Sequence, residues 1–599
     1  MLRILRIVFF LLVALRPSLG RAMKVAEAFC AVQLESAARL KSSGWFERVA
    51  KIEAEIGKLK SHIVYPDIPS VADLHLPTEG PKPLLGFSEL SPGLVHPLIE
   101  EGRRTKAFQD FKFLSDARLR EFTDADQVEQ ALAVARSQGH PFPVIGDSLG
   151  HRAYVRSLIE GLYNFESELV PALGYAQKKW RLNSKQSSVN AAFDYTEDSL
   201  QGLVRWTHQH AGSSALEAPY PVLIPSAGRF HEAYYWDTFW GVLWLLRTGR
   251  VELAKMQVEN LLSLVRRYGF IPNGMRDYYL SRSQPPFLSS VVRAVLSADG
   301  KGKQTNEWLR RRAYPLMVRD YQNFWMNPQT RWDAASGLNH HWDAFDWERE
   351  ERYGEDVELF LGRTFRDTRC EAEAGTDFCD SFEGEASNVA GTILNSMLYQ
   401  TELDLAFFAE RLGLRSDVTK FKEAAANRKR RMQRLWNEKK GYFQNWNLRT
   451  KSRVDQLTAE TFFPMMVGLA SQEQARQIMD ALPTLEREGG IMASENHNPA
   501  KQWTGRNAWA VYFYAAAAGV RRYGYGEAAK RLASKWVGMT ASVHERRGAM
   551  FERMDVVSLD IPDERENHKY PTERGFLWTN AAFVWALTDI LGHRFEPLP

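Results

Sequence analysis

An irregular segment in the middle of the chain concentrates side chains that could bind a polar ligand. It reads FIPNGMRDYYLSRSQPP (270–286). A Pro-Asn-Gly turn opens it and two prolines close it, and its apolar residues follow no helical or strand period, so no helix is expected to run through it. Arg276 and Arg282 stay charged and therefore need acceptors. Carboxylates of the protein or the hydroxyl and ring oxygens of a sugar would supply them.

Two carboxylates that are distant in sequence are candidates for acid–base chemistry. The stretch EAEAGTDFCDSFEGE (371–385) crowds acidic residues on both sides of Asp377. Crowded carboxylates favour the protonated form of one of them, which a general acid requires. Glu552 lies between the apolar residues Phe551 and Met554 in GAMFERMDVVS (548–558). Both stretches have an ordinary alternative, because most acidic runs are solvated loops and a single glutamate is usually structural.

Two further stretches place aromatic and polar side chains at the start of a predicted helix. They are GRFHEAYYWDTFW (228–240) and AKQWTGRNAWA (500–510). In the first, the alternative to a binding site is a helix cap with a buried aromatic cluster. In the second, Gln502, Trp503, Asn507 and Trp509 lie at the mouth of the helix.

The elements between these loops are predicted to be helices that follow one another in pairs. Strong helical periodicity covers 236–269, with a break at Gly249, and recurs in 387–413, 416–437, 470–483, 505–524, 526–547 and 579–594. Strand-like runs are few and short, as at GYFQNWNL (441–448). Paired helices without alternating strands predict an all-α toroid, in which loops at one end of the helix barrel make the site.

Composition bounds the possible partners of the protein. The chain has 599 residues, of which 44% are hydrophobic, so it can bury a large core. Its formal net charge of +4 gives no reason to expect a nucleic-acid partner. No cluster of histidine, cysteine and carboxylate residues has metal-ligand spacing, so neither a metal nor another cofactor is expected.

The N-terminus indicates whether the protein is exported, and the cysteines indicate whether it can form a disulfide. Arg3 and Arg6 precede a short apolar run that ends in small residues, which is typical of a signal peptide over 1–22 and predicts export without a membrane anchor after its removal. A retained anchor or a fortuitous apolar start are the alternatives. An extension, a helix followed by a Pro/Gly-rich segment, is expected over 23–105. Cys370 and Cys379 could form a disulfide or remain separate core thiols.

Three of these stretches, together with GFLWTN (575–580) near the end of the chain, resemble the trehalases, family 37 of the glycoside hydrolases. The loop YYLSRSQPP is the most specific match, GRFHEAYYWD and QWTGRNAW resemble the two family signatures, and GFLWTN resembles the closing motif. The similarity covers roughly residues 110–595 in the family's order. The resemblance implies an (α/α)6 toroid over 106–599 that cleaves the disaccharide α,α-trehalose to two glucose molecules with inversion.

The resemblance also implies roles for individual residues. Asp377 matches the general acid, and Glu552 matches the general base. Arg229, Arg282 and Arg349 match three pocket arginines. The other positions that match the family's pocket are Phe230, Tyr234, Trp236, Asp237, Asn273, Gln284, Glu351 and Gly375. The irregular loop that carries Arg282 is then the hydrogen-bonding wall of a sugar pocket.

The chain departs from the family pattern at several positions. Thr376 replaces a tryptophan beside the acid, Thr504 replaces an aspartate in the second signature, and Lys569 replaces a glutamate at the end of a glycine-rich loop. A stiffer, charged loop could alter closure, rate or specificity. Hydrolysis of another α-linked glucoside, or sugar binding without catalysis, are therefore the alternatives to a trehalase.

Overall fold

The computed structural model describes residues 169–207, 214–299, 303–352, 364–563 and 571–598, together with Lys112 and the strands β1 (Arg118–Leu119) and β2 (Tyr163–Asn164). Contacts between residues group 91–599 into one compact unit. The predicted signal peptide (1–22) and extension (23–105) lie outside the described residues. The predicted domain boundaries therefore stay predictions.

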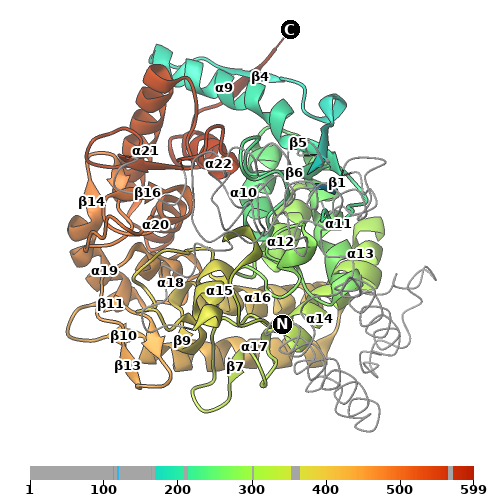
Figure 1. The fold of residues 1–599 in the computed structure, drawn as a ribbon, viewed down its shortest axis with the longest axis vertical. Helices are drawn as coiled ribbons and strands as arrows, with labels where there is room; N and C mark the ends of the chain where they lie inside the picture. The colour runs from blue at the N-terminus through green and yellow to red at the C-terminus, as the bar shows by residue number, and fades with distance from the viewer. Residues whose placement is uncertain are drawn as a thin grey trace, which may run out of the picture. The chain divides into compact units, whose positions relative to one another are not determined.

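Six of the described helices form a closed inner ring (Figure 1). Each helix packs against the next one around the ring, and the last packs against the first. In this order they are α10 (Tyr235–Arg247), α12 (Leu288–Asp299), α16 (Thr392–Leu412), α18 (Phe463–Met466), α20 (Ala510–Arg522) and α22 (Leu577–Trp585).

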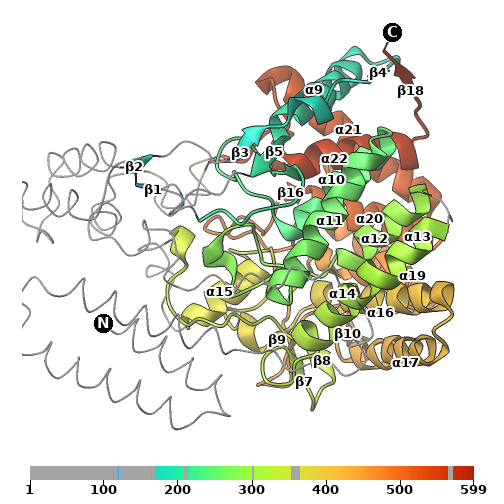
Figure 2. The ribbon, with the colours of Figure 1, turned by 90° about the vertical axis from the view of Figure 1, so that its right-hand side faces the viewer.

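An outer layer of helices covers this ring. Along the chain, outer and inner helices alternate, so each inner helix follows an outer one. Figure 2 shows one such inner–outer neighbour pair, α16 and α17, lying side by side. The outer helices are α9 (Ser187–Leu203), α11 (Val251–Tyr268), α13 (Lys303–Trp308) with α14 (Tyr314–Arg319), α17 (Arg415–Arg431), α19 (Gln472–Leu485) and α21 (Gly526–Arg547). This alternation confirms the predicted (α/α)6 toroid.

The hydrophobic pattern of each helix explains its layer. Residues 235–245 of α10 are all buried, as expected of a helix with neighbours on every side. In α17, by contrast, only Phe421, Ala425 and Arg428 are buried, which is one stripe at helical spacing. Gly249 adopts a φ of +65° between α10 and α11, at the predicted break.

Strands are short and pair only in antiparallel fashion within the described residues. The pair β16 (Asn507–Trp509) and β17 (Arg553–Asp555) matters for the site, because it links the segment before α20 to the segment after α21. The others are β3 (Leu169–Pro171), β4 (Trp180–Leu182), β5 (Val204–Thr207), β6 (Val222–Leu223), β7 (Trp332–Asp333), β8 (Leu338–Asn339), β9 (Val389–Ala390), β10 (Trp436–Asn437), β11 (Tyr442–Phe443), β12 (Trp446–Asn447), β13 (Ser452–Arg453), β14 (Glu486–Arg487), β15 (Gly490–Ile491) and β18 (Phe595–Pro597).

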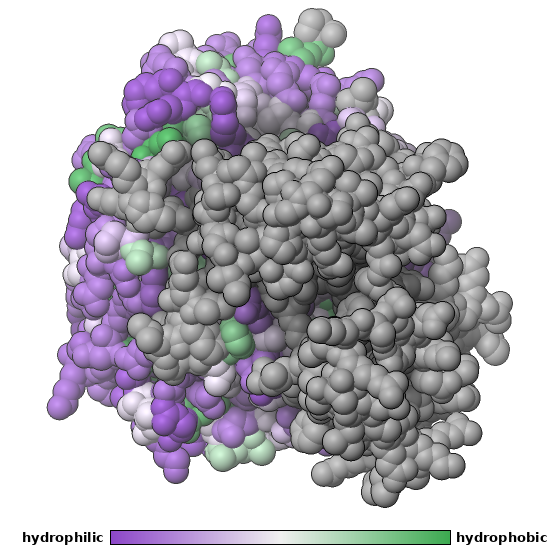
Figure 3. Space-filling model, in the orientation of Figure 1, coloured by the Kyte–Doolittle hydropathy of each residue, from purple (hydrophilic) through white to green (hydrophobic). Residues whose placement is uncertain are grey.

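The exposed surface of the described residues is mostly hydrophilic in the view of Figure 3. Large apolar side chains are exposed at only four described positions, Tyr175, Tyr220, Phe407 and Val557. None of the described helices is both long and apolar enough to span a bilayer.

Candidate active site

One cavity at the end of the ring where inner helices begin is lined by all the residues to which the sequence assigned a catalytic or sugar-binding role. Its volume is about 670 Å³, including its opening to solvent. The thirteen predicted residues that line it are Arg229, Phe230, Tyr234, Trp236, Asp237, Asn273, Arg282, Gln284, Arg349, Glu351, Gly375, Asp377 and Glu552. They come from the segments that precede α10, α12, α16 and α22, and from the first turn of α10.

The irregular segment 270–286 packs against the start of α10. The side chain of Gln284 accepts a hydrogen bond from the backbone N–H of Trp236 at 3.1 Å, and the hydroxyl groups of Tyr234 and Tyr279 lie 2.7 Å apart. Asn273 donates to the carbonyl oxygen of Ala372 at 3.1 Å, which ties the segment to the end of α15 (Phe365–Glu373). A single 3₁₀ turn, η4 (Asp277–Tyr279), interrupts the otherwise irregular backbone.

The two arginines of this segment find different acceptors. Arg276 does not line the cavity, and its Nε lies 3.2 Å from a carboxylate oxygen of buried Glu232. Arg282 lines the cavity and is fully buried, with Nη2 at 2.6 Å from Glu351 and Nη1 at 3.4 Å from Asp343. Both arginines thus pair with carboxylates of the protein, and only Arg282 is a pocket residue.

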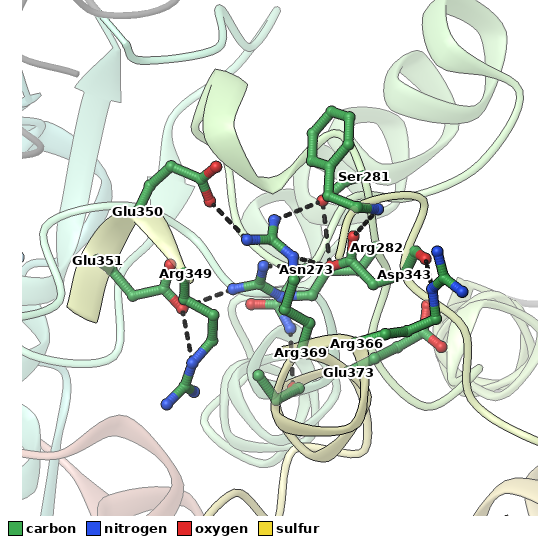
Figure 4. A network of polar contacts seen from close by, with 12 residues as sticks. Asn273, Ser281, Arg282, Asp343, Arg349, Glu350, Glu351, Arg366, Arg369 and Glu373 are labelled. Atoms are coloured by element: carbon green, nitrogen blue, oxygen red, sulfur yellow. Dashed lines mark hydrogen bonds and ion pairs between the residues drawn. The ribbon is translucent and has the colours of Figure 1, made fainter. Parts of the chain in front are cut away.

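Glu351 and its neighbours form a network of ion pairs, shown in Figure 4, that reaches the wall of the cavity at Arg282, Arg349 and Glu351. Burial by itself raises the pKa of Glu351. The positive charges of Arg282, Arg349 and Arg369 together lower it by more, so its pKa lies below the ordinary value. Glu351 is therefore ionised at neutral pH. Its second oxygen, Oε2, is buried and finds no hydrogen-bond donor among the described residues.

Asp377 follows a tight turn after α15. Gly375 has a φ of +75°, and a Cβ there would lie 2.5 Å from the ring of Trp236, so both the backbone and the close packing require glycine. Phe378 also has a positive φ, 62°, a strained conformation that often marks functional sites. The carboxylate of Asp377 is partly exposed and accepts a hydrogen bond from Arg349 at 3.2 Å.

Glu552 directly precedes β17 and is almost completely buried. Its backbone is fixed from two sides, since its N–H donates to the carbonyl of Glu573 at 2.9 Å and its own carbonyl accepts from the indole of Trp578 at 2.8 Å. The side chain of Arg553 donates to its carboxylate at 3.0 Å. Asp377, in the segment before α16, and Glu552, in the segment before α22, thus line the same cavity.

Asp237 provides a third carboxyl group in the cavity. Burial raises the pKa of Asp237 to about 8, and the negative charge of Glu552 acts in the same direction. Asp237 is therefore largely protonated at neutral pH while Glu351 is charged. Its Oδ1 has no hydrogen-bond partner within the described part of the chain.

Aromatic side chains that had no predicted role complete the walls. Trp503 and Trp509 stack with centroids 3.7 Å apart, and Trp578 contacts both rings edge-on. The unassigned lining residues are Pro225, Tyr279, Arg352, Ala372, Phe378, Gln502, Trp503, Trp509, Phe576 and Trp578. Most of them lie within or beside the quoted stretches, so their proximity to those motifs was the available signal.

The positions that depart from the family pattern lie in different surroundings. Thr376 is fully buried, does not line the cavity, and has its hydroxyl 3.8 Å from the sulfur of Cys379. Thr504 is also buried and hydrogen-bonds the carbonyls of Asn498 and Lys501, both at 2.9 Å. Lys569 lies outside the described residues.

Cys370 and Cys379 are separate buried thiols rather than a disulfide, and burial raises the pKa of each. Among the described residues, no group of three or more histidine, cysteine or carboxylate side chains is arranged to hold a metal ion.

The buried carboxyl of Asp237 predicts a particular pH dependence of stability. Its pKa of about 8 in the folded protein exceeds the ordinary 3.8. Its protonation therefore stabilises the fold fully below pH ~4, and this contribution is lost as pH rises through about 8. Relative to Asp237→Asn, the wild type should lose about 1.4 kcal/mol of unfolding free energy per pH unit across this range. Denaturant titrations from pH 5 to 8 measure it, and a constant difference would contradict the assignment.

Comparison with known proteins identifies relatives of this chain. The trehalase family profile matches residues 166–590. A periplasmic trehalase of Xanthomonas oryzae pv. oryzae is 30% identical over 417 residues, which is 65% of this chain and 71% of that protein. A probable trehalase of Saccharomyces cerevisiae is 30% identical over 432 residues, covering 62% of this chain and 55% of that protein.

A solved structure extends the similarity to the fold. The neutral trehalase Nth1 from Saccharomyces cerevisiae superposes with a TM-score of 0.54 at 28% identity, covering 61% of this chain and 73% of that one. The matched region contains all thirteen residues predicted to line the cavity. From the extent of the family match, the ring of helices and this cavity, we conclude that the chain belongs to the trehalase family of glycoside hydrolases, as a divergent member.

Proposed function

We propose that the protein hydrolyses α,α-trehalose to two glucose molecules by an inverting mechanism. The observation that carries the proposal is that Asp377, Glu552 and the three predicted arginines line a single cavity. An inverting glycosidase needs two carboxyl groups on opposite sides of the scissile bond, with room for one water between them. A closed helix ring allows two distant loops to provide them.

In this mechanism Asp377 donates a proton to the glycosidic oxygen as the bond breaks. Glu552, as the ionised partner, removes a proton from the water that attacks the anomeric carbon from the opposite face. The buried position of Glu552 keeps its carboxylate close to the bound sugar and away from bulk solvent. Arg553, at 3.0 Å, favours the charged form that a base requires.

The polar groups of the cavity suit a neutral, hydroxyl-rich ligand. The buried acceptor atoms of Asp237 and Glu351 without a donor would each accept a hydrogen bond from a sugar hydroxyl. Protonated Asp237 can also donate a hydrogen bond, so it can act as donor or acceptor toward a sugar hydroxyl. The aromatic rings offer apolar faces that exclude water. The wall formed by segment 270–286 favours binding of the sugar in one orientation.

The substrate is tested with a panel of disaccharides and purified protein. Glucose release is expected from trehalose and scarcely from maltose, sucrose or kojibiose. Inversion predicts that NMR spectra taken in the first minutes show α-glucose and β-glucose in equal amounts, since only the attacked ring changes its anomeric form. A preference for another α-linked glucoside would favour that alternative. Tight sugar binding with no release of glucose would favour the non-catalytic alternative.

The two carboxylates are tested by isosteric substitution. Asp377→Asn and Glu552→Gln should each lower turnover by about 10²–10⁴-fold, because proton transfer is lost while the shape of the cavity is kept. Asp380→Asn is the matched control, since Asp380 lies in the same loop but pairs with Lys501 and does not line the cavity. Near-normal turnover in either test variant would remove that residue from its role.

We also retain export as part of the proposal. The Xanthomonas relative is named as periplasmic, which agrees with the signal peptide predicted over 1–22. N-terminal sequencing of the protein recovered from its native host should find a chain that lacks these residues. A mature protein that still begins at Met1 would exclude cleavage.

A further inference from the structure

Six charged residues at and beside the wall of the cavity form a continuous set of ion pairs, which we call the ion cluster; five of them are buried and Glu350 is partly buried. Its members are Arg282, Arg349, Arg369, Asp343, Glu350 and Glu351. Figure 4 shows them converging from segment 270–286, from the segment before α15 and from α15 itself. The cluster thus connects three parts of the chain that carry cavity residues.

Asp343 occupies the centre of the ion cluster. One of its oxygens, Oδ2, lies 2.9 Å from Nε of Arg369 and 3.4 Å from Nη1 of Arg282. The same oxygen accepts a hydrogen bond from Ser281 at 3.2 Å, and the other oxygen accepts from the backbone N–H of Phe345 at 2.8 Å. Asp343 is fully buried and does not line the cavity.

The rest of the cluster leads from Asp343 to the cavity. Arg282 forms an ion pair with Glu351 at 2.6 Å. Glu351 lies 4.0 Å from Arg349, which in turn pairs with Asp377 at 3.2 Å. On the other side, Arg369 pairs with Glu350 at 3.1 Å. Positive and negative groups therefore alternate from Glu350 to Asp377.

The charges of the ion cluster balance without Asp377. Three guanidinium groups face three carboxylates within the cluster. The pKa values of Arg282 and Arg369 are raised and that of Glu351 is lowered, each against the effect of burial, so these groups stay charged at neutral pH. The charge of Asp377 is therefore not needed to compensate the arginines of the cluster.

This balance matters because Arg349 alone would oppose the proposed chemistry. A guanidinium at 3.2 Å favours the ionised form of a carboxyl, whereas a general acid must hold its proton. Glu351 gives Arg349 a second carboxylate, and Asp343 shares Arg282 with Glu351. Without the charge of Asp343, the cluster would carry a net positive charge next to Asp377.

We propose that Asp343 is a positioning residue for catalysis, which holds Arg282 and Arg369 and supplies the negative charge that lets Asp377 remain protonated. The inference rests on the proposed function, in which Asp377 is the general acid. Asp343 acts through the arginines, since it lines no part of the cavity itself.

Other charged groups also face Asp377. Arg229, Arg352, Asp237 and Glu552 line the same cavity, and the guanidinium groups of Arg349 and Arg352 both lie over the ring of Phe378, at 5.2 and 4.8 Å. On the side of Asp343, Arg366 donates to its backbone carbonyl at 3.2 Å. A substitution at Asp343 leaves all these groups in place, so comparison with the wild type isolates the one charge.

The test is the pH profile of kcat/KM for trehalose, which reports the ionisation of the free enzyme. In Asp343→Asn the cluster gains net positive charge, the acid loses its proton more readily, and the alkaline limb should move to lower pH by roughly one unit. Ser281→Ala is the uncharged control, because it removes a hydrogen bond to Asp343 and leaves the limb unmoved.

A compensating double variant separates charge from packing. Asp343→Asn combined with Arg369→Gln restores equal numbers of positive and negative groups, so the alkaline limb should return toward the wild-type position. A purely structural role predicts the opposite, because the double variant loses more buried contacts. If Asp343→Asn does not fold, Glu350→Gln makes the same change of charge at a residue whose side chain is 13% exposed, and it should shift the limb in the same direction.

The possible outcomes distinguish the two proposals. An unmoved limb in the charge variants, with an active wild type and an inactive Asp377→Asn, overturns the role of Asp343 and leaves the proposed function intact. A wild type that hydrolyses no disaccharide, or a fully active Asp377→Asn, overturns the proposed function and the role of Asp343 with it.

Discussion

The ion pair between Arg282 and Glu351 joins two irregular segments that have no regular backbone pairing with each other. At 2.6 Å, and with both side chains almost completely removed from solvent, it fixes the wall of the cavity that carries Arg282 to the segment that carries Arg349. Removal of one partner from such a buried pair costs about 3–5 kcal/mol, because the other charge is left uncompensated. The geometry around Asp377 depends on this contact, since Arg349 is the residue that binds its carboxylate.

Closure of the helix ring supplies the second constraint. Each inner helix begins at the same end, so the segments that precede α10, α12, α16, α20 and α22 must meet there. Loops of this kind hold functional groups well only when a rigid scaffold positions both of their ends. Contacts such as that of Gly375 with Trp236, where even one methyl group would not fit, show how closely the segments approach.

Burial alone does not decide the charge of a carboxyl group in this cavity. Asp237 and Glu351 are both buried, yet the pKa of the first is raised and that of the second is lowered. The difference comes from their neighbours, since Asp237 faces the negative charge of Glu552 and Glu351 faces three arginines. One cavity can therefore hold a protonated and an ionised carboxyl group at the same pH, which acid–base chemistry exploits.

The sequence by itself determined the helix pairs, the irregular loops between them and the residue types that line the cavity. These features are local: a helical period, a Pro-Asn-Gly turn or a string such as YYLSRSQPP can be recognised without knowing what lies nearby.

Only the tertiary structure decided which acceptor each arginine has. By residue type and loop position alone Arg276 and Arg282 look alike, and only the family resemblance singled out Arg282; in the structure the first pairs with Glu232 outside the cavity and the second with Glu351 at its wall. Asp343 gave no sequence signal at all, because its importance comes from two arginines that approach it from different segments once the ring closes. Likewise, Cys370 and Cys379 could have formed a disulfide on the basis of their spacing, but in the tertiary structure they are separate buried thiols. Contacts between distant segments depend on the path of the whole chain, and no short stretch of sequence contains that information.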